Sequence, residues 1–307
     1  MYPIRQIDRL QAEDIEYLGT KRKFWFTMAA QRYLFKAEER GTGEDWAGKV
    51  VCELARLVGL PHVEYELAHE FEGQLAMQPG VICPTFVPRP LILVLGNQLL
   101  VWRDPAYPAE DQRKYGIREY TVDAVAGIVS LLKAPAPEWM RTAPAEITNA
   151  IGVFIGYMML NSWVANQDRH HQNWGAIIHD RSLLLAPTFD HGASLARNLS
   201  DKERKDRLTT RDRKRSLEHF AGRARSGFYS SSNDGKTMLA LDVFRSFSKQ
   251  DRDAARIWLG KLAKISQNAM DTILAEIPPQ RMSPVTREFT WQLLMINQRR
   301  LLESLQP

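Results

Sequence analysis

Two acidic residues and one amide lie close together in the second half of the sequence. Asp168 and Asn173 begin and end the segment DRHHQN, and Asp190 follows a short apolar run. Mg²⁺ in nucleotide sites takes one or two carboxylates and an amide while leaving room for water and phosphate. Asn173 and Asp190 suit that role, and Asp168 could orient or deprotonate a hydroxyl nucleophile. These residue types could therefore hold a divalent metal, carry out phosphoryl transfer, or merely tie two loops together.

The elements around these residues would bring them together. The apolar run at 151–165 predicts a buried helix, and GAIIHDRSLLLAPTFD predicts a hairpin whose turn spans residues 179–182. Asp168 and Asn173 then lie on the loop between helix and hairpin, and Asp190 lies just past the returning strand. The acids are therefore expected to be neighbours.

Histidines in the same region permit a second interpretation, a transition-metal phosphoesterase site. The sequence contains no H-x-H or H-E-x-x-H frame that would place two of them on one ion. We expect His170 to support the loop beside Asp168, and His179, in the hairpin turn, to face solvent. The histidines concerned are His170, His171, His179 and His191.

The first hundred residues predict a small sheet carrying one helix. Two aromatic-rich runs within 22–36 predict a hairpin that ends on Lys36, and apolar residues recur at helical spacing over 44–58. Further strands are expected at 63–68 and at 91–102, the second interrupted by a tight turn. Lys36 becomes a candidate for binding nucleotide phosphates, the alternative being an exposed lysine at a strand end.

Helical periodicity dominates the rest of the chain, at 121–133, 144–166, 236–247, 250–276 and 284–305. We therefore predict an α+β protein with a β-rich N-terminal lobe and a mainly helical C-terminal lobe. Residues 1–100 would form a small β-rich N-lobe that covers the nucleotide. Residues 101–307 would form a mainly helical C-lobe with the catalytic loop and the metal-binding segment.

The segment GTGEDW at 41–46 begins like a dinucleotide-binding fingerprint. Trp46 occupies the place of the third glycine, which argues against that interpretation. A helix start explains the segment better, because Glu44 and Asp45 would complement the positive end of the helix dipole.

Bulk properties bound the function only broadly. The chain has 307 residues and a formal net charge of +5, a small excess that weakly favours anionic partners. Its two cysteines show no CxxC spacing, which suits a reducing, cytoplasmic compartment. The charged N-terminus shows no secretory signal, and the most apolar runs are too short to span a bilayer. We expect no membrane association.

The sequence resembles the HipA-like kinases, the serine/threonine kinase toxins of bacterial toxin–antitoxin modules, in a compact form. The resemblance covers most of residues 17–197 and rests mainly on NQDRHHQNWGAII and LLLAPTFDHGASLA. It implies a bilobal kinase fold, ATP with Mg²⁺ as phosphate donor, and a protein serine or threonine as acceptor. The acceptor could be an aminoacyl-tRNA synthetase or another translation component. An antitoxin partner is also implied, whereas direct nucleic-acid binding is not expected, because no helix-turn-helix is visible.

The resemblance also implies roles for individual residues. Lys36 would bind the nucleotide, Asp168 would be the catalytic base with His170 supporting its loop, and Asn173 and Asp190 would hold the metal. A loop over the phosphates and one glutamate complete the expected nucleotide site, and these residues are Gly19, Thr20, Lys21 and Glu44.

The sequence departs from a typical kinase in two places. The glutamate that pairs with the lysine is expected at a position held by Gly48, with Glu44 one turn earlier and Glu53 beyond. The phosphate-covering loop is poor in glycine. These departures leave open a nucleotide-binding pseudokinase that acts by binding a partner.

Two further alternatives concern the acceptor. The order D-R-H-x-x-N followed by Asp-x-Gly is similar to that of phosphatidylinositol kinases, so a lipid acceptor stays open. The charged run at 201–215 predicts either a solvated helix or loop, or an activation or substrate-docking segment that follows the metal-binding residues.

Overall fold

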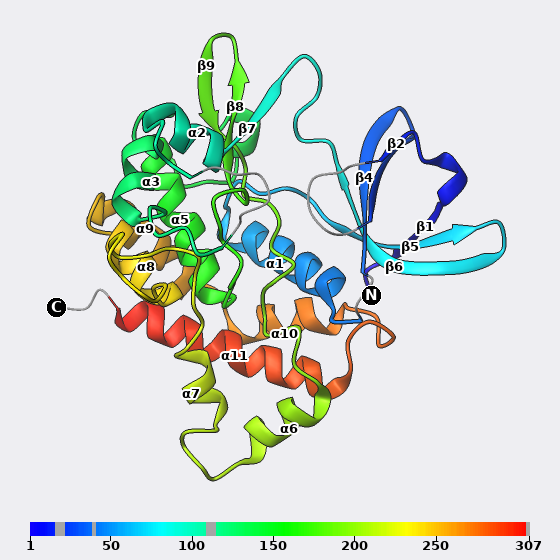
Figure 1. Cartoon of the computed structure of the whole chain (residues 1–307). Helices are drawn as coiled ribbons and strands as arrows, with labels where there is room; N and C mark the ends of the chain where they lie inside the picture. Colours follow the sequence, from blue (N-terminus) through cyan, green and yellow to red (C-terminus); the bar gives the residue numbers. More distant parts are fainter. Residues whose placement is uncertain (16–21, 39–40, 109–114, 305–307) are drawn as a thin grey trace.

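The computed structural model describes residues 1–15, 22–38, 41–108 and 115–304. A six-stranded sheet lies beside a larger helical part, and a long segment after the sheet connects the two (Figure 1). This arrangement confirms the predicted α+β fold with a β-rich N-terminal part and a helical C-terminal part. The sheet consists of β1 (Ile4–Asp8), β2 (Asp14–Ile15), β3 (Lys23–Met28), β4 (Gln31–Ala37), β5 (Glu66–Glu72) and β6 (Leu75–Pro84).

The strand order in this sheet is β1-β5-β6-β4-β3-β2, and every pair is antiparallel except β1 with β5. A dinucleotide-binding fold requires parallel strands joined by helical crossovers, and the described part of the chain lacks that arrangement. The fingerprint interpretation of residues 41–46 is therefore wrong.

The hairpin of β3 and β4 is the one predicted from residues 22–36, and its two faces differ in chemistry. Since side chains alternate along a strand, one face buries a compact aromatic cluster that includes Phe24, Phe26 and Phe35. The opposite face points toward the helical part. It carries the polar and larger residues Lys23, Trp25, Arg32, Leu34 and Lys36.

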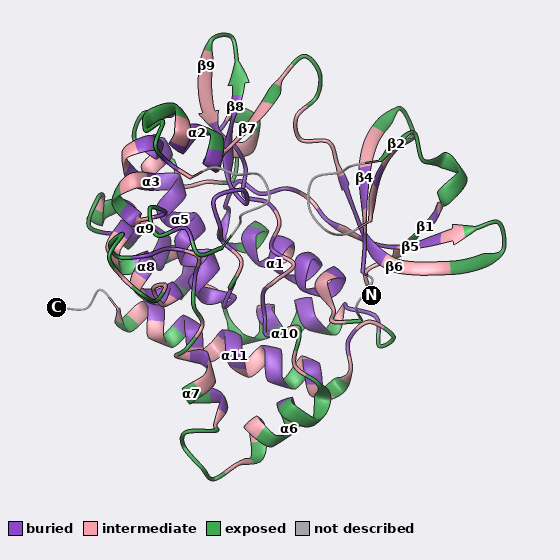
Figure 2. Ribbon diagram, in the orientation of Figure 1, coloured by how far each residue is buried: buried purple, intermediate pink, exposed green. Residues whose placement is uncertain are grey.

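Helix α1 (Glu44–Val58) has the bounds that its apolar spacing predicts. It ends at Gly59, whose left-handed conformation (φ 84°) allows its N–H to bond the carbonyls of Ala55 and Arg56. The helix is buried along most of its length between the sheet and helices α9 (Arg252–Ala263) and α10 (Gln267–Ala275) (Figure 2).

The helical part is built around α5 (Ala150–Trp163), which is buried on nearly all sides and therefore shows no amphipathic stripe. A second sheet of order β7-β8-β9 stands over it. The remaining elements are β7 (Ile92–Leu95), α2 (Gly96–Arg103), α3 (Val122–Val129), α4 (Pro137–Met140), β8 (Gly175–His179), β9 (Ser182–Leu185), α6 (Asp201–Thr209), α7 (Leu217–Ala221), α8 (Ala240–Phe247) and α11 (Pro284–Glu303).

The predicted strand at 91–102 is only half right. Residues after Leu95 form α2, because Gln98 accepts a hydrogen bond from the Leu95 N–H and so begins a helix in place of a hairpin turn. Gly96 permits this turn, since a Cβ atom there would lie 2.3 Å from the Trp174 ring. The predicted helix at 250–276 is likewise two helices, because Ser266 caps a new start by accepting from the Ala269 N–H.

The hairpin of β8 and β9 confirms the predicted turn at residues 179–182. Asp180 and Arg181 both adopt positive φ angles, 44° and 62°, as a two-residue turn that follows the strand twist requires. No helix within the described ranges has the length and apolarity of a membrane span.

Candidate active site

Two cavities meet where the sheet faces the helical part. One, of about 310 Å³, is lined mainly by apolar side chains, and the other, of about 250 Å³, by charged ones. They share the residues Lys23, Lys36, Tyr65, His170, Asn173 and Asp190. A flat apolar group and an adjoining charged group could therefore bind side by side as parts of one ligand.

The apolar cavity lies between the sheet and the segment that leaves it. Leu34 and Trp25 form the wall on the sheet side, and Leu93 and Leu95 of β7 form the opposite wall. Phe86, from the connecting segment, lies against Phe189 with ring centroids 5.5 Å apart. The cavity thus offers a slot for an aromatic base.

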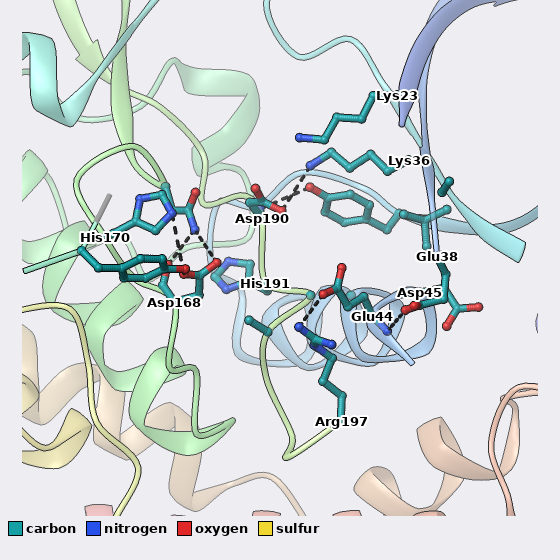
Figure 3. Close-up of a pocket in the computed structure, with 18 residues that line it drawn as sticks. Lys23, Lys36, Glu38, Glu44, Asp45, Asp168, His170, Asp190, His191 and Arg197 are labelled. Atoms are coloured by element: carbon teal, nitrogen blue, oxygen red, sulfur yellow. Dashed lines mark hydrogen bonds and ion pairs between the residues drawn. The ribbon is translucent and has the colours of Figure 1, made fainter. Parts of the chain in front are cut away.

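Lys36 and Lys23 bring positive charge to the junction of the cavities. They are direct partners in the β3–β4 ladder, so both amines project from the same face of the sheet (Figure 3). Lys36 Nζ lies 3.3 Å from Asp190 Oδ1. Although burial alone would lower the pKa of Lys36, the Asp190 carboxylate contributes to raising it above its usual value, so the lysine stays charged.

Asp190 is held at this point by its backbone. Its φ angle of 59° lies in the left-handed region, and its N–H donates to the hydroxyl of Tyr65 at 3.3 Å. The side chain is 42% exposed and lines both cavities. The strained backbone therefore directs the carboxylate toward Lys36 and the open space.

Asp168 lies across the charged cavity in the loop after α5. The side-chain amide of Asn173 donates to the Asp168 carbonyl at 2.6 Å, and the Tyr115 hydroxyl donates to Asp168 Oδ1. His170 Nδ1 accepts the Gln172 N–H at 3.1 Å, which places a proton on Nε2, 3.7 Å from Asp168 Oδ1. The His170 ring thus lies beside the Asp168 carboxylate, and its support of this loop stays a prediction.

Arg169, from the same loop, is fully buried and ties the two acid-bearing segments together. Its guanidinium donates to the Asn173 carbonyl, to Thr188 Oγ1 at 3.0 Å and to Asn161 Oδ1 at 3.1 Å. No carboxylate pairs with it among the described residues. Burial accordingly lowers the pKa of Arg169 to about 10.

The other histidines of the region do not gather around an ion. Both ring nitrogens of His191 lie within 3.2 Å of Arg169 Nη2, and burial beside that cation holds its pKa well below the usual value. His171 Nδ1 lies 3.0 Å from the Tyr107 hydroxyl, and His179 is exposed in the hairpin turn. Within the described ranges none of them belongs to a group of three metal-ligating side chains.

Solved structures of two kinases share the fold of this chain. The proinflammatory kinase CtkA of Helicobacter pylori superposes with a TM-score of 0.70 and 18% identity, over 99% of this chain and 100% of that one. The HipA toxin of Shewanella oneidensis, solved with HipB and operator DNA, gives a TM-score of 0.52 and 10% identity, over 95% of this chain and 62% of HipA. The chain has the fold of these kinases. No protein-family model matches the sequence, and no curated protein matches it significantly.

This kinase fold confirms the resemblance to HipA at the level of three-dimensional structure. The agreement is independent of the motifs, because 10% and 18% identity leave most side chains different. It also places the two segments quoted for the resemblance around one pair of cavities.

The glutamate expected to pair with Lys36 in a kinase fold is absent from the described part of α1. Glu44 instead forms an ion pair with Arg197, which follows the Asp190 segment, and Glu53 pairs with Lys49 at 2.5 Å. Glu44 still lines the charged cavity, as Figure 3 shows. The lysine therefore uses Asp190 as its counter-ion in this structure.

The donor set fits a hard divalent cation. Asp190 supplies a partly exposed carboxylate, and Asn173 uses its amide nitrogen on the Asp168 carbonyl, which leaves the amide oxygen as a ligand. That oxygen accepts no hydrogen bond from the described residues. A cation bound to these two oxygens would neutralise the Asp190 carboxylate in place of Lys36.

Some predicted residues cannot be placed. Gly19, Thr20 and Lys21, expected to cover the phosphates, lie outside the described residues. The charged run at 201–215 forms α6 and the loop after it, and α6 packs against α11. Arg204 of α6 donates to the carbonyls of Ala196 and Arg197, which connects this helix to the segment after Asp190. A role of residues 201–215 in substrate docking stays a prediction.

The sequence analysis did not single out several residues of the site, among them Lys23, Tyr65, Tyr115 and Arg197. Lys23 could have been predicted from the sequence, because a hairpin centred on residues 29 and 30 pairs it with Lys36. The other three lie on loops or next to strand ends. No periodic pattern in the sequence predicts that these segments lie close to Asp168 and Asp190.

Proposed function

We propose that the protein is an ATP-dependent serine/threonine protein kinase. The observation that supports this most is the Lys36–Asp190 pair at the junction of an apolar and a charged cavity. Asp168 and Asn173 line the same charged cavity. A kinase needs this combination, because catalysis consists mainly of positioning and charge neutralisation around the transferred phosphate.

The two cavities suggest how ATP would bind. The base would enter the apolar slot between Leu34 and Leu95, and the phosphates would extend toward Lys36 and Lys23. Asn173 and Asp190 would hold Mg²⁺, which neutralises charge on the phosphates when bound. A role of Gly19, Thr20 and Lys21 in covering the phosphates, which the resemblance implies, is part of the proposal.

Asp168 would accept the proton of the acceptor hydroxyl. Its carboxylate faces the charged cavity, and His170 Nε2, 3.7 Å from it, would support its orientation. The Tyr115 hydroxyl now occupies one carboxylate oxygen, so an acceptor would have to replace that contact.

The resemblance of the sequence to the HipA-like serine/threonine kinases favours a protein acceptor over a lipid. For HipA of Shewanella oneidensis the structure includes HipB and operator DNA. By analogy we propose an antitoxin-like partner here, and a substrate among translation proteins such as an aminoacyl-tRNA synthetase. The two free, buried cysteines suit action in the cytoplasm.

The test is phosphate transfer from γ-labelled ATP in the presence of Mg²⁺, with wild type and Asp168→Asn compared on a panel of proteins and of phosphoinositide vesicles. We expect label on serine or threonine with wild type only, located by mass spectrometry. Label on lipid alone would replace the proposal by a phosphatidylinositol-kinase-like activity.

The missing glutamate partner of Lys36 favours one second candidate, a pseudokinase that binds nucleotide and acts through a partner. Binding of a fluorescent ATP analogue without transfer to any acceptor, and without release of phosphate, would support it. Turnover that is abolished by Asp168→Asn would exclude it.

A further inference from the structure

A second cluster of ligand-type side chains lies outside both cavities. Cys52 of α1 and His62 and Glu64 of the segment after it place one donor atom each within 4.8 Å of the others. Cys52 Sγ lies 3.5 Å from Glu64 Oε2, and His62 Nε2 lies 3.4 Å from Glu64 Oε1.

These separations are those of a tetrahedral metal site. Zinc binds sulfur, nitrogen and oxygen donors at about 2.0–2.3 Å, which places neighbouring ligands about 3.5 Å apart. Two of the three separations therefore already match, before any adjustment of side chains.

The orientation of the His62 ring is also that of a metal ligand. Its Nδ1 lies 2.6 Å from the Leu60 carbonyl and donates to it, which fixes the tautomer with the lone pair on Nε2. The residue is only 9% exposed, and its Nε2 has no hydrogen-bond partner among the described residues. A buried nitrogen directed at a thiol and a carboxylate without a hydrogen bond is costly unless another group uses it.

Arg56 is the competitor for this position. Its Nη2 pairs with Glu64 Oε2 and lies 3.8 Å from Cys52 Sγ, so a cation already neutralises the cluster. Its side chain is 45% exposed and its Nε lies 3.3 Å from Glu53 Oε2, so it can turn outward and remain paired.

We propose that Cys52, His62 and Glu64 bind a divalent ion of the zinc class, with water as a fourth ligand. The thiolate and imidazole donors select such an ion over Mg²⁺. The proposal is independent of the kinase activity, because none of these residues lines either cavity.

The ion would stiffen the connection behind Asp190. The Val63 N–H donates to the Thr188 carbonyl at 3.0 Å, and the Thr188 N–H donates to the Pro61 carbonyl at 2.9 Å. A metal on His62 and Cys52 would join α1 to this connection. It would therefore act as a structural brace between α1 and the strand that leads to Asp190.

Cobalt provides the decisive probe, because a thiolate bound to Co²⁺ absorbs in the near ultraviolet whereas oxygen ligands such as Asp190 and Asn173 do not. Metal-free full-length protein, prepared with a chelator and a reductant, is titrated with Co²⁺ and then with Zn²⁺. We expect the band to saturate at about one Co²⁺ per chain and to vanish as Zn²⁺ replaces it.

Variants assign the band. Cys52→Ser should abolish it, and His62→Gln should weaken binding by about tenfold or more, while Cys83→Ser, the matched change at the other buried cysteine, should leave it intact. Arg56→Gln should tighten binding by about tenfold, because it removes a positive charge beside the ion. Folding of each variant is checked by circular dichroism. If Cys52→Ser proves to be unfolded, the result for His62→Gln decides the question.

A wild-type titration without a thiolate band would overturn the proposal. So would a band of full strength in Cys52→Ser, or binding that Arg56→Gln weakens.

Discussion

The two cavities form one cleft, whose walls are the six-stranded sheet and the helical part. These two walls position their functional groups in different ways. On the sheet side, Lys23 and Lys36 are placed by strand register alone, since their backbones are held by the β3–β4 ladder. On the helical side, Asp168 and Asp190 lie on irregular backbone that is held by side chains, chiefly Arg169 and its contacts to Asn173, Thr188 and Asn161.

This difference determines what a substitution should do. A change in a sheet-side lysine removes one charge and leaves the ladder intact. A change in Arg169 removes the group that several acceptors share, so the loop and the acids it carries should suffer together. Activity and stability should therefore separate on one wall and move together on the other.

The acids themselves should give the largest effect. Asp168→Asn and Asp190→Asn remove the base and a metal ligand with almost no change in volume, so phosphate transfer should fall by about 10³-fold in each. Transfer of label from ATP measures this. Asp180→Asn, an exposed acid in the β8–β9 turn, is the control and should keep full activity. Activity retained in Asp190→Asn would refute its assignment.

Arg169 should give the largest loss of stability. Arg169→Met leaves the acceptors of the loop without donors, which should lower the free energy of unfolding by about 3 kcal/mol and abolish transfer. Urea unfolding measures the first effect. Arg256→Met, at an exposed position, should change stability by less than about 0.5 kcal/mol. Equal stability of the two variants would mean that the loop is held by other contacts.

The lysines sharpen the contrast. Lys36→Met should lower transfer by about 10²-fold and Lys23→Met by about tenfold, since Lys36 Nζ lies 3.3 Å from Asp190 Oδ1. The urea midpoint should change little in either variant. Lys202→Met, on the exposed face of α6, serves as control. A large stability loss in Lys36→Met would contradict placement by register.

The helical wall should also be sensitive to acid. The pKa of His191 is held below its unfolded value of about 6.5, so below that pH the unfolded chain binds a proton that the folded chain excludes. Stability should therefore fall as the pH drops below about 6.5. Thermal unfolding between pH 8 and pH 5, without divalent metal, should show a smaller decrease in His191→Gln than in wild type. Parallel curves would exclude His191 as the source.

Tyr115 should give the smallest effect. Its hydroxyl donates to Asp168 Oδ1, so Tyr115→Phe frees the oxygen that an acceptor needs and makes the base stronger. Transfer should increase about threefold, measured as the initial rate at saturating ATP. A decrease would show that the hydroxyl contributes to catalysis.

Sequence periodicity predicted the regular elements well and the irregular ones poorly. The bounds of α1 and the β3–β4 hairpin follow from apolar spacing. The strand expected after Gly96 is a helix, because a contact with Trp174 and a side-chain cap at Gln98 outweigh β propensity. Such a contact between distant residues leaves no periodic trace.

The candidate site divides in the same way. Residue types and spacing were enough to bring Asp168, Asn173 and Asp190 to one cavity. The partners of Lys36 and Glu44 could not be predicted, because both ion pairs join residues about 150 positions apart in the chain. Arg169 lies between two predicted residues, yet nothing in the sequence marks it as the buried centre of the loop.

The burial of α1 has a consequence for regulation. Asp45, in its first turn, pairs at 2.8 Å with Arg281 of the helical part, and both side chains are almost completely buried. Kinases that are switched by swinging this helix away from the nucleotide need it to detach from its surroundings. Here detachment would break a buried ion pair and expose the apolar faces on both sides. Control of this molecule should therefore act by blocking or opening the entrance to the cleft, with α1 fixed in place throughout.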